Sequence, residues 1–90
     1  MIPNSIKIGG IPYEIILTTM VDEGNVKHSE GQILINKDLC ESKQELALIH
    51  EIIEIIIAEH ELKIKHHKIM TISNVLHQII IDNTKLFRGD

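Results

Sequence analysis

The spacing of apolar positions changes part-way along the chain, and the first part is typical of β-strands. Residues 5–8 (SIKI) alternate polar and apolar side chains, and Gly9-Gly10 then marks a turn. Residues 13–18 (YEIILT) and 32–36 (QILIN) are rich in β-branched side chains, whereas residues 21–31 are polar and indicate a turn or an irregular hairpin. The connections are too short for helical crossovers, so we expect antiparallel strands.

After residue 40 the apolar positions recur at helical spacing. Ser42 and Glu45 form the pattern of a capping box, which predicts a first helix over about residues 43–62. A second helix is predicted over about residues 66–83, and its apolar stripe should face the first helix. That stripe comprises Ile69, Ile72, Leu76, Ile79 and Ile80. We expect the last residues, 84–90, to fray.

Length and element order together predict one domain over residues 1–90. We interpret the fold class as α+β, with a small antiparallel sheet of two or three strands at about residues 5–36. Two packed helices follow the sheet. The oligomeric state stays open at this point.

Charge and cysteine content narrow the class of protein. The net charge is -4 and no long basic run is present, which argues against a nucleic-acid partner. No apolar run reaches the ~18 residues that predict a membrane span, and the first residues lack the pattern of a signal peptide. Cys40 is the single cysteine, so no internal disulfide can form. We therefore expect a soluble cytoplasmic protein without a membrane partner.

The first predicted helix carries the most specific chemical pattern, His50-Glu51-Ile52-Ile53-Glu54. A zinc peptidase helix would read His-Glu-x-x-His, so Glu54 stands where a histidine is usual. Residues four apart share one face of a helix, so His50 and Glu54 project the same way. A carboxylate is a normal zinc ligand, and two histidines with one glutamate form a standard catalytic set. One more histidine should then come from elsewhere.

Five of the six histidines fall between positions 50 and 77. His60 would lie ~15 Å along the helix axis from His50, too far to share an ion, and His77 lies three turns into the second helix. His66 and His67 open that helix, and His66 continues the stripe that faces the first helix. Geometry therefore favours His66 as the third ligand, with His67 kept as the alternative. Taken alone, the short motif is more typical of a solvated helix face than of a metal site.

Several segments in this order resemble a known family. Residues 6–13 (IKIGGIPY), 32–35 (QILI), 48–51 (LIHE) and 72–83 (ISNVLHQIIIDN) are similar to segments of small phage and mobile-element proteins with a compact HExxH metallopeptidase-like domain. These proteins are related to the ImmA/IrrE-type zinc peptidases. The resemblance covers nearly the whole chain and implies a minimal zincin-like fold, in which the strand at residues 32–36 forms an edge of the sheet.

The resemblance also assigns roles to single residues. His50 matches the family's first metal ligand, and Glu51 matches its general base, which takes a proton from the attacking water. Glu54 stands in place of the second histidine. His66 stands at or next to the place of the family's glutamate ligand. The ligand types His, His and Glu would then be kept, with two of them exchanged in position.

Two functions follow as hypotheses. The first is a zinc-dependent peptidase-like hydrolase, with Zn²⁺ held by His50, Glu54 and His66 and with a protein or peptide substrate. The alternative is a catalytically inactive, metallopeptidase-like binding module for a regulatory protein. A ferritin-like di-iron site ranks last, because it needs a four-helix bundle and the N-terminal strands do not fit one.

Overall fold

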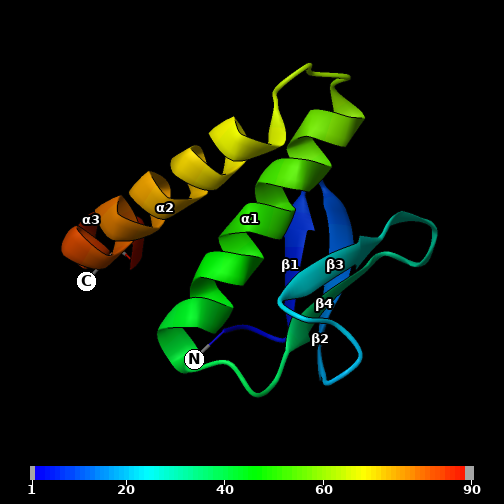
Figure 1. The fold of residues 1–90 in the computed structure, drawn as a ribbon, viewed down its shortest axis with the longest axis horizontal. Helices are drawn as coiled ribbons and strands as arrows, with labels where there is room; N and C mark the ends of the chain where they lie inside the picture. The colour runs from blue at the N-terminus through cyan, green and yellow to red at the C-terminus, as the bar shows by residue number, and fades with distance from the viewer. Residues whose placement is uncertain (1, 89–90) are drawn as a thin grey trace.

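The computed structural model describes residues 2–88, which form an α+β fold. The strands are β1 (Ser5–Ile8), β2 (Ile11–Thr18), β3 (Gly24–Lys27) and β4 (Gln32–Asn36), with a 3₁₀ turn η1 (His28–Glu30) before β4. The helices are α1 (Glu41–Glu59), α2 (His66–Asp82) and the short α3 (Thr84–Arg88). Helix α1 lies between the sheet and α2 (Figure 1). The predicted α+β class and the two packed helices are confirmed. We expected residues 84–90 to fray, but residues 84–88 form α3, and residues 89–90 lie outside the described part of the chain.

The sheet differs from the predicted one in strand number and direction. It has four strands in the order β1-β2-β4-β3, and β2 pairs with β4 in parallel. The polar segment that we read as a turn contains β3, which pairs antiparallel with β4. In chain order β3 follows β2, but in the sheet β4 lies between these two strands. The prediction that residues 32–36 form an edge was wrong, because β4 is internal and the two edge strands are β1 and β3.

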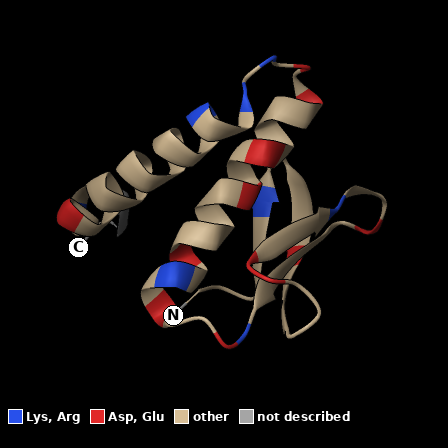
Figure 2. Cartoon of the chain, in the orientation of Figure 1, with Lys and Arg blue, Asp and Glu red and all other residues tan. Residues whose placement is uncertain are grey.

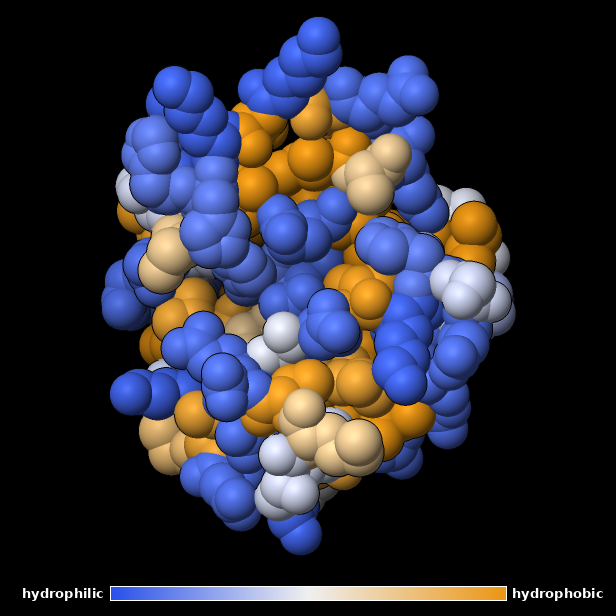
Figure 3. Space-filling model, turned by 45° about the vertical axis from the view of Figure 1, so that its right-hand side comes forward, coloured by the Kyte–Doolittle hydropathy of each residue, from blue (hydrophilic) through white to orange (hydrophobic). Residues whose placement is uncertain are grey.

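The core lies between the sheet and α1. Ile33 and Ile35 of β4 and Ile55 of α1 are fully buried, which fits the internal position of β4. The core cluster comprises Ile2, Tyr13, Ile15, Ile33, Ile35, Ala47, Leu48 and Ile55. Apolar side chains also reach the surface, where they form patches between hydrophilic residues (Figure 3). Within residues 2–88, none of the helices has the length and apolar character that crossing a membrane requires.

Both ends of α1 differ from the prediction. The N-cap is Cys40, without a side-chain hydrogen bond, so the capping box predicted at Ser42 does not form. At the other end, the Leu62 amide donates to the Ile57 carbonyl (3.0 Å) and Glu61 is left-handed with φ 53°. This is a Schellman ending with glutamate at the position where glycine is usual, which explains why the sequence did not mark the stop. It turns the chain back toward α1.

Helix α2 is rotated about its axis relative to the predicted stripe. Its buried residues are Ile69, Ser73 and His77, spaced four apart. Ile72 and Ile79, which we expected to face α1, are 45% and 43% exposed. The packed face also carries polar contacts to α1, from Ser73 to His50 (3.4 Å) and from His77 to Glu45 (3.3 Å). The apolar pattern on α2 is wider than the part that packs on α1.

Candidate metal centre

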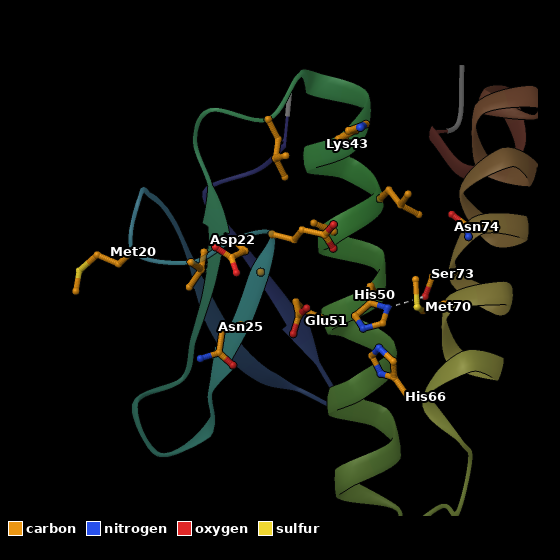
Figure 4. Close-up of a pocket in the computed structure, with 16 residues that line it drawn as sticks. Met20, Asp22, Asn25, Lys43, His50, Glu51, His66, Met70, Ser73 and Asn74 are labelled. Atoms are coloured by element: carbon orange, nitrogen blue, oxygen red, sulfur yellow. Dashed lines mark hydrogen bonds between the residues drawn. The ribbon is translucent and has the colours of Figure 1, made fainter.

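His50, Glu54 and His66 converge where the start of α2 passes α1. Helix α1 supplies His50 and Glu54 from successive turns of one face, and His66 is the first residue of α2. One ligand atom from each side chain lies within 4.8 Å of the other two. The imidazole rings of His50 and His66 meet edge to face, with centroids 5.3 Å apart (Figure 4). The structure thus brings together the three residues that the sequence singled out as ligands.

The spacing of these three donors suits a small metal ion. Ligand atoms that bind a tetrahedral ion at about 2.1 Å lie about 3.4 Å from one another. Small side-chain rotations would therefore close the group around an ion. His50 and Glu54 are half-buried and His66 is exposed, so one side of the group faces solvent. A catalytic site needs such an open position.

Ser73 of α2 orients the His50 ring. Its hydroxyl is almost fully buried and donates to the Ile69 carbonyl at 2.7 Å. Because its proton is used there, the Ser73 oxygen acts as acceptor toward His50 Nδ1, which lies 3.4 Å away. Nδ1 then carries the ring proton and Nε2 keeps its lone pair. In metal-binding histidines, the ring nitrogen that does not bind the metal usually donates a hydrogen bond, which fixes the tautomer and the orientation of the ring.

The other histidines lie outside this group. Within residues 2–88 the metal-binding group contains neither His67 nor His77. His77 instead contacts Glu45 of α1, with Nε2 3.3 Å from Oε1. His60 is the exposed C-cap residue of α1. Of the two candidates that open α2, His66 is therefore the one placed at the site.

Glu51 lies on the sheet side of α1, beside this group. Its side chain extends toward β3, whereas the His50 and His66 rings lie on the side of α2 (Figure 4). Burial is the largest cause that raises the pKa of the Glu51 carboxyl, and together with the nearby charges of Glu54 and Glu23 it brings that pKa to about 7. A carboxyl group with this pKa can accept and release a proton near neutral pH.

Gly24 at the start of β3 makes room for Glu51. A Cβ atom at Gly24 would lie 3.1 Å from Glu51 Cγ and 3.2 Å from the Leu34 carbonyl oxygen. The edge strand can approach this carboxyl so closely because position 24 has no side chain. Glu51 is consequently only 9% exposed, although it lies next to a cleft.

An open cleft of about 880 Å³ runs beside these residues. Its walls come from α1, from the first half of α2 and from residues 20–25, which lead into β3. The Asn36 side chain holds that segment in place by donating to the carbonyls of Val21 (2.9 Å) and Asp22 (3.0 Å). His50, Glu51 and His66 all line the cleft, so a bound molecule could reach the imidazoles and the carboxyl together.

No protein-family model, curated protein or solved structure matches this chain. The family resemblance accordingly rests on the quoted sequence segments alone.

Sequence reasoning missed three residues that shape the site: Ser73, Gly24 and Asn36. Ser73 interrupts the apolar positions of α2, and a polar residue on a packed face is a sign of a buried polar contact. Gly24 and Asn36 gave no such sign, because their roles depend on the position of β3. That strand was itself not predicted.

Proposed function

We propose that this protein is a small zinc-dependent, peptidase-like hydrolase with a variant HExxE…H site. The observation that carries the proposal is the convergence of His50, Glu54 and His66 within 4.8 Å. Two imidazoles and one carboxylate are the donor set of well-known zinc peptidases. The resemblance to compact phage and mobile-element peptidase domains supports the same function, and the exchanged order of ligands becomes part of the proposal.

Three residues of this chain would bind the metal, and a fourth would transfer protons. His50, Glu54 and His66 would hold the ion, which when bound supplies Lewis-acid polarisation of a peptide carbonyl. Glu51 would take a proton from the attacking water and deliver it to the amide nitrogen of the departing amine. A pKa of about 7 suits both transfers, because neither protonation state is strongly favoured at neutral pH.

The edge strand β3 supports a peptide as substrate. It borders the cleft through Gly24 and Asn25 and pairs with β4 along one side. An extended peptide can pair with the other side of an edge strand through main-chain hydrogen bonds, which give affinity with little demand on sequence. A peptide bound there would pass close to Glu51 and the two histidines.

The decisive measurement is the zinc content of the purified protein by mass spectrometry after expression with added zinc. We expect about one zinc per chain, as for a site of this donor set. Hydrolysis of a mixed library of quenched fluorescent peptides should then be detectable in the unmutated protein and absent in Glu51→Gln. The Glu51→Gln protein should still contain zinc.

Three outcomes separate the hypotheses. A protein without stoichiometric zinc would contradict the metal centre. A protein that contains zinc but cleaves no peptide would favour the alternative, an inactive binding module for a regulatory protein. Full activity in Glu51→Gln would exclude this carboxyl as the base.

Ser73→Ala tests the orientation of His50 by the hydroxyl. We expect zinc affinity to fall about 10-fold to 100-fold, the usual effect of removing a partner that orients a ligand. A competition titration with a chromophoric chelator measures the change. Thr71→Ala is the matched control, because the Thr71 hydroxyl also donates to a carbonyl four residues earlier in α2 but is exposed and away from the site. Equal affinities in both variants would show that Ser73 does not act on the metal centre.

A further inference from the structure

The outer face of α2 carries an apolar stripe that nothing in residues 2–88 covers. Ile72, Val75 and Ile79 are 45%, 54% and 43% exposed. They lie within about 60° of one another on the helix, on the side away from the buried Ser73. Alternating spacings of three and four residues form the seam by which one helix pairs with another, and here the seam points outward.

Charged residues mark both ends of this outer stripe. Lys68 and Asp82 continue the same spacing, and both are exposed. Between them α2 contains no Asp, Glu, Lys or Arg. Figure 2 shows the result as one blue segment at the start of α2, one red segment at its end and no charge between. Lys68 and Asp82 are each seven residues from Val75, one before it and one after it. The two ends of the stripe are therefore equally far from Val75 and carry opposite charges.

We propose that this stripe is the interface of a symmetric homodimer in which α2 packs antiparallel against α2 of a second copy. An antiparallel arrangement centred on Val75 brings Lys68 of each copy next to Asp82 of the other, with the apolar residues between. The two-fold axis then passes beside Val75, and the same patch serves both subunits, as a closed dimer requires. An anionic lipid surface would favour basic residues at both ends of such a stripe, and Asp82 does not fit it.

The interface lies away from the metal centre. Ser73, which faces His50, points about 160° from Val75 on the same helix. Dimer formation therefore leaves His50, Glu54 and His66 accessible, and it does not depend on the proposed hydrolase activity. Changes on the outer stripe should alter association without altering the zinc content.

Sedimentation equilibrium of the full chain, from about 1 µM to about 1 mM, tests the proposal. We expect a monomer–dimer equilibrium for the unmutated protein. Val75→Glu should raise the dissociation constant at least about 30-fold, because it places two carboxylates at the centre of an apolar interface. Ile81→Glu is the matched control: Ile81 is 43% exposed on the same helix but about 120° from Val75, so this variant should still dimerise.

A charge exchange tests the antiparallel arrangement separately. Lys68→Glu and Asp82→Lys should each weaken the dimer about 3-fold to 10-fold, because each places like charges opposite one another. The double variant should return to the unmutated dissociation constant. Circular dichroism spectra should match across all variants, since each substituted side chain is exposed on the surface of the single chain and is not part of its core.

Three results would overturn the proposal. One is a monomer at every concentration, including the case in which that monomer binds anionic lipid vesicles. Another is a dimer that survives Val75→Glu. The third is a double charge variant that is weaker than either single variant, which would exclude the antiparallel pairing.

Discussion

His66→Ala should lower the zinc affinity of this protein at least about 100-fold while the fold is kept. Loss of a residue that only orients a ligand costs about 10-fold to 100-fold, and loss of the ligand itself should cost more. His66 is exposed at the start of α2, so its removal leaves no cavity in the core. His67→Ala is the matched control, because His67 is the next residue, is also exposed, and lies outside the metal-binding group. Chelator competition gives both affinities.

The same site allows a test of whether the ligand types can be exchanged. Glu54→His combined with His66→Glu keeps two imidazoles and one carboxylate. It gives the order His, His, Glu that the family resemblance would lead one to expect. We expect the double variant to bind zinc within about tenfold of the unmutated protein, since the donor set is unchanged. Glu54→Ala should weaken binding as much as His66→Ala. If His66→Ala and His67→Ala bound zinc equally well, the proposed centre would be wrong.

The metal-free protein should lose about 2 kcal/mol of stability between about pH 5 and about pH 8 because of Glu51 alone. Folding raises the pKa of this carboxyl from its ordinary value of 4.5 to about 7, chiefly through burial. The folded state therefore favours the protonated form. The contribution to stability is fully present below about pH 4.5 and is lost as the pH rises through about 7. Above that pH the folded protein must hold a buried carboxylate next to Glu54.

Urea unfolding in the presence of a chelator, repeated at several pH values, measures this loss. Glu51→Gln has nearly the same shape but cannot ionise, so its stability should change less over the same range. The difference between the two proteins isolates Glu51 from the histidines, which both proteins share. Parallel curves for the two proteins would show that Glu51 is ionised in the folded state at neutral pH.

Local pattern was sufficient for most of the helical part. Apolar spacing placed α1 and α2 within a few residues of their observed bounds, because helical hydrogen bonds join residues only four apart. The same periodicity placed His50 and Glu54 on one face. It did not show that α1 begins at Glu41 without a capping box, or that it ends through a left-handed Glu61.

The sheet could be predicted only in part. Strand segments were found by composition, but strand order depends on pairing between distant residues, which short-range pattern does not specify. The polar residues of β3 did not indicate a strand, since one face of an edge strand is exposed to water. Because β3 pairs with β4, β4 is internal and β3 is at an edge of the sheet. It is therefore β3 that borders the cleft.

The sequence by itself determined the chemistry of the candidate centre, namely two imidazoles, one carboxylate ligand and a neighbouring carboxyl. It also determined the spacing that lets His50 and Glu54 reach one point. Only the tertiary structure decided that His66 completes the group, that Ser73 orients His50 and that Ile72 and Ile79 face outward. The physical reason is that the rotation of α2 follows from its contacts with α1, and these form only when the chain turns back after Glu61.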